Sequence, residues 1–549
     1  MRKHRHTIAD LLAAATTIAA LAMASATAAA GAPDQPLPQL FATSDRCLAC
    51  HNGMTTPSGE DLSIGFAWRA SIMANAARDP YWQAAVRREG MDHPDAALLI
   101  QDECAACHMP MARFQAHAGG RKAEVFAHLG PPPRVDPVDR LAVDGVSCSL
   151  CHQLQNSGPG LEHDGEFMID TSRPWGERRM FGPYDIPTER IRVMQSASTF
   201  VPARADNLGQ SELCSTCHTL YTTAIDDHGK AIARLPEQVP YLEWRHSAYA
   251  RERTCQACHM TVTPELAPAA SVLGEPRAGF ARHGFQGANF FMLGMLNRYR
   301  AELGVTALPD ELSSSRQRTL DLLHTQAATV SIARAQTRAG RLEVEVVVTN
   351  VAGHKVPTAY PSRRAWLRFE VRDARGRLLF ASGELRSDGS IEGNDNDRDP
   401  LTYEPHHQVI QSDEQVQIYE SIMVDARGRV TTALLSGVRY AKDNRLLPRG
   451  FDKRSAGDDF AVQGEAKADA DFDGGGDRIL YQPRLPTGVA GPLRIDVALE
   501  YQPIGFRWAH NLEAYRSAAE PARFLGYYTA MSGGSATELA RASVTVTSE

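Results

Sequence analysis

Cys104-Ala-Ala-Cys107-His108 is one of five stretches in this sequence in which two cysteines, two residues apart, are followed directly by a histidine. The chain has ten cysteines, and all ten belong to these stretches. An even number of cysteines in a secreted chain usually indicates disulfides, but a histidine after every pair argues against that interpretation. The five sets are Cys47, Cys50 and His51; Cys104, Cys107 and His108; Cys148, Cys151 and His152; Cys214, Cys217 and His218; and Cys255, Cys258 and His259.

This spacing has a chemical reason. Two thiols on one helical turn can each add to one of the two vinyl groups of a haem, and the next residue then places an imidazole under the iron as its proximal ligand. A zinc ribbon does not require a histidine after every pair, and a redox dithiol would not occur five times. The sequence therefore predicts five covalently attached haem c groups with the five motif histidines as proximal ligands.

The residue in the sixth position of each iron decides what that haem does. A histidine gives a low-potential electron-transfer haem, a methionine raises the potential, and an open position binds small molecules. For each candidate the alternative is an ordinary surface or hydrogen-bonded histidine, or a core methionine. The candidate distal ligands are Met73, His117, His246, His283 and His354.

The first residues, Met1-Arg-Lys-His-Arg-His6, precede an apolar run from Ile8 to Met23 and small residues up to Ala30. This pattern predicts a secretory signal peptide over residues 1–30, with a retained membrane anchor as the alternative. No other stretch is long and apolar enough to span a membrane, so we expect no integral span in the mature chain, and a periplasmic or extracellular location. The formal net charge of −7 does not suggest nucleic-acid binding.

The hydrophobic pattern changes along the chain. Residues 31–288 are rich in Gly, Pro and turn residues between the motifs and are predicted to form a pentahaem cytochrome c domain. Apolar stripes predict helices from Asn289 to about Ala335, and we assign 289–338 to bracing helices. From Gly340 apolar and polar residues alternate with a period of two, which predicts a β-sandwich over 339–549. The expected strands are Leu342–Thr349, Trp366–Val371, Gln415–Glu420 and Leu493–Tyr501.

The predicted fold class is therefore α+β. A mostly irregular and helical multihaem domain precedes an antiparallel, immunoglobulin-like β-sandwich.

An acidic loop lies within the predicted sandwich. Asp469, Asp471 and Asp473 alternate before Gly474, and Asp477 follows, as in the first half of a calcium loop. The terminal Glu of an EF-hand is missing, because Leu480 occupies its place. A second acidic loop runs from Asn394 to Asp399. The alternative for both loops is a solvated acidic surface without an ion.

The five motifs resemble those of multihaem c-type cytochromes, together with the segments Trp68–Ser71 and Trp244–Ser247 and the sequence Gly353-His354-Lys355-Val-Pro357-Thr358. The nearest similarity is to the tetrahaem electron carriers of hydroxylamine oxidation. This resemblance implies closely stacked haems, most with two histidine ligands, that pass single electrons. The chain differs from these tetrahaem carriers in having five motifs, Met73 and Tyr249 where histidine is expected, and an added C-terminal β-domain.

The function expected from these features is electron transfer between redox partner proteins, such as periplasmic or outer-membrane electron carriers. The alternative is a multihaem oxidoreductase that reduces or oxidises a small nitrogen or sulfur compound at one open haem. A third interpretation gives the β-domain a separate docking role. We assign no catalytic residue from the sequence.

Overall fold

The computed structural model describes residues 39–130, 134–155, 163–226, 228–338, 340–489 and 491–547. Leu40–Glu549 forms one compact unit. The signal peptide predicted over residues 1–30 lies outside the described residues, and the predicted domain boundaries stay predictions. In the part of the chain that is described, no helix is both long and apolar enough to cross a membrane.

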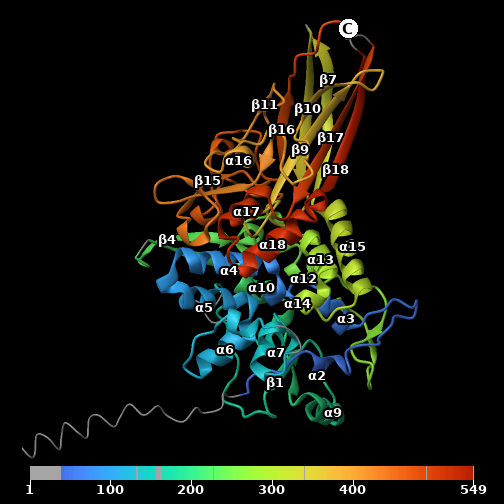
Figure 1. The fold of residues 1–549 in the computed structure, drawn as a ribbon. Coiled ribbons are helices and arrows are strands. Elements are labelled where there is room, and N and C mark those ends of the chain that lie inside the picture. The colour runs from blue at the N-terminus through green and yellow to red at the C-terminus, as the bar shows by residue number, and fades with distance from the viewer. Residues whose placement is uncertain are drawn as a thin grey trace, which may run out of the picture. The chain divides into compact units, whose positions relative to one another are not determined.

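The motif-bearing half consists of short helices, drawn in blue to green in Figure 1, with three small two-stranded sheets. Three of the five motifs lie within a helix, whereas the first begins in α2 and the third in α8, and both end just after those helices. The elements are α2 (Asp45–Leu48), α3 (Ile64–Arg69), α4 (Pro80–Asp92), α5 (Ala97–His108), α6 (Pro110–Ala118), α7 (Pro137–Val143), α8 (Cys148–Cys151), β1 (Arg179–Gly182), α9 (Thr188–Ser198), β2 (Val201–Arg204), α10 (Glu212–His218), β3 (Leu220–Ile225), β4 (Ala231–Gln238), α11 (Pro240–Arg245), α12 (Cys255–His259), β5 (Ala267–Pro268) and β6 (Pro276–Arg277).

Helix α4 shows how local sequence starts these helices. Asp79 precedes it, and its carboxylate accepts hydrogen bonds from the N–H groups of Tyr81 (2.8 Å) and Trp82 (3.1 Å). Pro80 stands at the first helical position, where the missing N–H costs nothing. The helix is therefore fixed at its N-terminus, and it buries Tyr81 and Ala84 in the main apolar core.

The C-terminal half is predominantly β, as predicted. One sheet has the order β10-β9-β17-β18, with β12 also paired to β9, a second has the order β11-β16-β8-β7, and a third, smaller sheet has the order β14-β13-β15. Helices α13 (Phe290–Arg298), α14 (Arg300–Leu303) and α15 (Pro309–Gln326) precede the strands, and α16 (Asp395–Arg398), α17 (Phe506–His510) and α18 (Ala519–Thr529) interrupt them. The strands are β7 (Ala328–Arg338), β8 (Arg341–Asn350), β9 (Arg364–Arg372), β10 (Leu378–Ser382), β11 (Val409–Ile410), β12 (Ile418–Tyr419), β13 (Ser421–Val424), β14 (Val430–Thr431), β15 (Arg439–Asp443), β16 (Gly476–Tyr481), β17 (Pro492–Gln502) and β18 (Thr537–Thr547).

The two larger sheets share one apolar core. Every second residue of β8 is buried, from Leu342 to Val348, which is the alternation expected of a strand with one face in a core. Phe369 of β9 and Tyr481 of β16, one from each sheet, lie face to face with ring centres 3.9 Å apart. The predicted sandwich is therefore present as two sheets whose apolar side chains meet in one cluster.

Two expectations need correction. Helix α15 ends at Gln326, and Ala328–Arg338 forms strand β7 instead of continuing a brace, because Thr329, Val330 and Ile332 bring β-branched side chains to the edge of β8. The strand expected over Gln415–Glu420 is reduced to Ile418–Tyr419. The two larger sheets are antiparallel as predicted, apart from the short pairing of β11 with β16, which is parallel.

The first and last parts of this unit share a core. Tyr81 of α4 packs against Phe524 of α18 with ring centres 5.1 Å apart, and Arg87 forms a two-pronged ion pair with Glu520 (2.8 and 2.9 Å). The β-rich half therefore supports the motif-bearing half directly.

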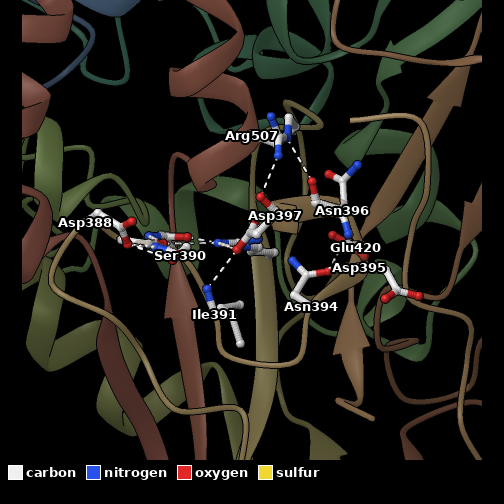
Figure 2. Close-up of polar contacts among 12 residues, drawn as sticks. Asp388, Ser390, Ile391, Asn394, Asp395, Asn396, Asp397, Glu420 and Arg507 are labelled. Atoms are coloured by element: carbon white, nitrogen blue, oxygen red, sulfur yellow. Dashed lines mark hydrogen bonds and ion pairs between the residues drawn. The ribbon is translucent and has the colours of Figure 1, made fainter. Parts of the chain in front are cut away.

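The second acidic loop has a structural role, shown in Figure 2. Asp397 forms a bidentate ion pair with Arg364 (2.8 and 2.9 Å), and both side chains are almost fully buried. The N–H of Ile391 also donates to the Asp397 carboxylate (2.8 Å), and Arg507 donates to the carbonyl oxygens of Asn396 and Asp397. Arginine side chains thus neutralise and order this loop.

Replacing Arg364 with Met should lower the free energy of unfolding by about 3–5 kcal/mol, because Asp397 would stay buried without a counter-charge. The double variant Arg364→Met/Asp397→Leu should recover most of that loss. Urea unfolding followed by far-ultraviolet circular dichroism measures both values. An equal loss in the single and the double variant would contradict this role for the ion pair.

Candidate functional site

The imidazole rings of four motif histidines are oriented by backbone carbonyl groups. In each case the ring nitrogen Nδ1 lies within hydrogen-bond distance of a carbonyl oxygen, on a segment far from the motif in sequence. The contacts are His51 with Ala269 (2.7 Å), His108 with Ala76 (2.9 Å), His152 with Phe181 (2.6 Å) and His259 with Gln286 (2.5 Å). A histidine that binds a metal through one ring nitrogen usually donates a hydrogen bond from the other to such a carbonyl oxygen.

These contacts determine which ring nitrogen is available. A carbonyl oxygen only accepts, so Nδ1 must carry the proton, and the lone pair of the neutral ring is then on Nε2. Burial lowers the pKa of His108 to about 4 and also lowers that of His152, so both rings are neutral at pH 7. The motif histidines are therefore prepared to bind a metal through Nε2.

Two further histidines have the same arrangement and lie opposite motif histidines. His283 directs Nδ1 to the carbonyl of Ala281 (2.9 Å), and its ring centre is 6.4 Å from that of His152, with the planes 14° apart. His354 directs Nδ1 to the carbonyl of Lys355 (2.9 Å), and its ring centre is 6.2 Å from that of His259, with the planes 10° apart. Both are among the predicted distal ligands.

These separations fit one metal between two imidazoles. A histidine nitrogen binds a transition metal at about 2 Å, so two rings on opposite sides of one metal have centres roughly 6.3 Å apart. The rings are too far apart for direct face-to-face contact, and each Nδ1 is already used. The His152–His283 and His259–His354 pairs would therefore each hold one haem iron between two imidazoles, and the adjacent cysteine pairs would supply the thiols for its attachment.

Thiols from different motifs touch one another. A hydrogen bond between Cys47 and Cys148 lowers the pKa of the first thiol and raises that of the second well above its usual range. Cys217 is in the same kind of contact with Cys107. These thiols stand in for the thioether sulfurs of the haem-bound form. They bring the first motif beside the third, and the second beside the fourth.

The fifth motif adjoins the fourth. A thiol–thiol hydrogen bond with Cys214 lowers the pKa of Cys255 to about 7, and the N–H of Cys255 also donates to Ser211 Oγ (3.1 Å). Hydrogen bonding to Cys255 raises the pKa of Cys214, hydrogen bonding to Cys107 raises that of Cys217, and the nearby thiol of Cys151 in the third motif adds to both shifts. All five motifs thus form one continuous cluster.

Gly165 shows how closely two of these motifs approach. Its N–H donates to the carbonyl of Thr216 in the fourth motif (2.8 Å). Its φ of +72° is in the left-handed region, and a Cβ there would lie 2.9 Å from the Cβ of Ala106 in the second motif. Only glycine lets the backbone pass between the two motifs without displacing either.

Two predicted distal ligands do not fit this role. Nε2 of His117 lies 2.8 and 3.0 Å from the two carboxylate oxygens of Asp102, and Nε2 of His246 lies 3.0 Å from the carbonyl of Asp452. In both residues Nε2 therefore carries the proton, and neither ring faces a motif histidine at the spacing given above. In this arrangement neither residue binds through Nε2, and a ligand role for either stays a prediction.

Met73 is placed beside the third motif. Its carbonyl oxygen accepts the N–H of Val146, two residues before Cys148 (3.1 Å). The imidazole opposite His152 in that motif is His283, so Met73 does not fit as its ligand. A role for Met73 at another haem stays a prediction.

Sequence reasoning did not select His128 and His163. Nδ1 of His128 contacts Asp139 Oδ1 (2.7 Å), and Nδ1 of His163 contacts Asp164 Oδ2 (2.9 Å). Nε2 is then available in both, as in the ligand pairs. The neighbouring Asp164 could have indicated from the sequence that His163 is a candidate ligand. Asp139 lies 11 residues from His128, and no local pattern connects the two residues.

The predicted calcium loop does not bring its four carboxylates together, and this expectation is corrected. Asp469 and Asp477 are buried, whereas Asp471 and Asp473 are exposed. The ammonium group of Lys453 donates to the carbonyl oxygens of Ala466, Asp469 and Phe472. A lysine side chain thus occupies the place in the loop where a cation would be expected.

Asp469 and Asp477 form a compact buried group with His406. Nδ1 of His406 accepts hydrogen bonds from the side-chain amides of Gln417 (2.9 Å) and Asn444 (3.1 Å). Nε2 therefore carries the proton and donates it to Asp469 Oδ2 (3.1 Å). Because the His406 ring has no lone pair directed at the carboxylates, this group is a hydrogen-bonded core network and does not fit a metal.

No family model matches the sequence, and no curated protein matches it. Among solved structures the chain is similar to a penta-heme cytochrome c552 from Thermochromatium tepidum, with 15% sequence identity and a TM-score of 0.49, over 92% of this chain and 100% of that chain. A similarity at this level does not establish a shared function, so the interpretation depends on the motifs and their geometry.

Replacing His283 or His354 with Ala in the haem-loaded protein should convert one haem from low spin to high spin in each variant, because one axial imidazole is lost. Electron paramagnetic resonance and visible spectra measure this change. His117→Ala and His246→Ala are matched controls that should leave every haem unchanged. A loss of low-spin signal in these controls, with none in the first two variants, would reverse the assignment.

Proposed function

We propose that this chain is a secreted pentahaem c-type cytochrome that transfers single electrons through covalently bound, mostly six-coordinate haems. The observation that carries this proposal is the opposed imidazole pair at two of the five motifs: His152 with His283 and His259 with His354, with ring centres 6.4 and 6.2 Å apart. Thiols of different motifs also adjoin one another, first with third, second with fourth, and fourth with fifth. Electron transfer requires cofactors close to one another, and adjoining attachment points favour that arrangement.

When bound, the haems supply reversible one-electron redox chemistry at iron. The chain attaches them through ten thiols and orients the motif imidazoles through backbone carbonyls. His283 and His354 close two of the sixth positions, which favours electron transfer over substrate binding there. Burial lowers the pKa of His283 to about 4 and also lowers that of His354, so both stay neutral ligands at pH 7.

The setting of this function follows from the sequence pattern of the first residues. Covalent haem attachment and a signal peptide over residues 1–30 both support export, to the periplasm or the cell exterior. The proposed partners are redox proteins of a respiratory or extracellular electron-transfer chain.

A second candidate function is the redox conversion of a small nitrogen or sulfur compound at one open haem. His218 favours it: among the described residues its ring, like those of His51 and His108, has no second imidazole at the metal-bridging distance, and His218 also lies near Arg363. Burial, His259 and then the positive charge of Arg363 lower the pKa of His218 to about 4. A cationic side chain beside an open iron would attract an anionic substrate.

Low-temperature electron paramagnetic resonance of the oxidised protein, with and without nitrite, separates the two functions. If the chain is an electron carrier, all haems should be low spin and unaffected by nitrite, because every sixth position would be filled. A high-spin signal that shifts with nitrite, and shifts less in Arg363→Gln, would contradict the carrier and favour the enzyme. Arg364→Gln is not a suitable control because it breaks the ion pair with Asp397, so Arg277→Gln serves instead, since Arg277 is half-buried on β6 and pairs with Glu275 (3.7 Å).

A further inference from the structure

The loop that carries His354 is held at its start by the sandwich. Asn350 ends β8, and its side-chain amide donates to the carbonyl oxygens of His354 (2.8 Å) and Leu446 (2.9 Å). Its side-chain oxygen accepts the N–H of Ala352 (2.7 Å). The backbone of residues 350–354 is therefore fixed to the β-rich half of the unit.

The motif-bearing half holds the same loop from the other side. Tyr249 donates from its hydroxyl to the carbonyl of Val351 (2.9 Å), and Ser247 donates to the carbonyl of Gly353 (3.1 Å). A Cβ at Gly353 would lie 3.5 Å from the Trp244 ring. At the position where the resemblance leads us to expect a histidine ligand, Tyr249 instead binds the loop that carries one.

Lys355, the residue after His354, begins a buried ionic network. Its side chain is fully buried, with an exposed fraction of 0%, and its Nζ donates to Asp443 Oδ2 (2.7 Å). Its backbone N–H donates to Glu243 Oε2 in helix α11 (3.1 Å). Thr358, three residues further on, also donates to this carboxylate (2.6 Å).

Arg445 completes the network. It donates to both carboxylate oxygens of Asp443 (2.8 Å each) and lies 3.0 Å from Glu243 Oε1. Burial alone would raise the pKa of Asp443, but Arg445 and Lys355 hold it well below its usual range. Two carboxylates and two cations balance, and such a group is stable out of water only while all its members are present.

We infer that Lys355 and Glu243 are positioning residues that hold the His354 imidazole opposite His259. The inference rests on the proposed function, since it concerns how one axial ligand is kept in place. Glu243 comes from α11 in the motif-bearing half, and Asp443 and Arg445 come from β15 and the segment after it. The network thus joins the two halves at the residue next to the ligand.

The test uses the haem-loaded full chain and four variants: Glu243→Gln, Lys355→Met, His354→Ala and Lys442→Met. Lys442 is a matched control, because it is equally buried and pairs with Glu420 (3.0 Å), but its hydrogen bonds do not reach the loop. The readouts are the low-spin signals in electron paramagnetic resonance and carbon monoxide binding to the reduced protein. In Glu243→Gln and Lys355→Met, one haem should lose low-spin character and gain carbon monoxide binding, at the haem that His354→Ala opens. Lys442→Met should change neither.

The outcomes distinguish the positioning role of Lys355 and Glu243 from the ligand assignment of His354 on which it rests. If His354→Ala opens one haem and both network variants retain the native spectrum, the positioning role is overturned while the ligand assignment stands. If His354→Ala opens no haem, the ligand assignment itself fails. Should the charge-removing variants not take up haem, Thr358→Val removes one hydrogen bond to Glu243 without burying a lone charge. It should then speed carbon monoxide binding at the same haem, and an unchanged rate would overturn the inference.

Discussion

The hydrogen bond from a histidine Nδ1 to a backbone carbonyl is the interaction on which the site depends. It fixes the tautomer and the ring orientation together, and it directs a lone pair on Nε2 toward the space where a metal fits. The carbonyls come from segments remote from the motifs: Ala269 serves His51, and Phe181 serves His152. The irregular backbone between the motifs is therefore functional, because its carbonyl groups orient the ligands.

The same criterion separates histidines that the sequence alone treats alike. His117 and His246 use Nε2 for a carboxylate and a carbonyl, whereas His283 and His354 keep it available. Since His354 comes from the β-rich half, that half would supply a ligand to the proposed haem and would not act only as a cover. Arg445 and Glu243, 202 positions apart by their residue numbers, then fix this ligand through one buried network.

Local spacing was enough to predict the strands β8, β9 and β17, and to propose the proximal histidines from the five motifs, because each depends on residues close together in sequence. It failed where distant residues decide the outcome. Lys453 fills the carbonyl cluster of the predicted calcium loop from 16 positions away, and β7 becomes a strand because β8 offers an edge. The contact of His128 with Asp139 and the position of His354 opposite His259 likewise depend on tertiary contacts. The resemblance to multihaem cytochromes pointed to the loop of His354 but not to the network beneath it.

The central claim is that this chain folds around five covalently bound haems. Its most direct test is the intact mass of the protein, purified under denaturing conditions from a host that attaches haem c. The account predicts a mass increase of five haems over the processed chain, with no unmodified cysteine, since all ten belong to motifs. A chain that carries fewer haems while its cysteines form disulfides or bind zinc would contradict it.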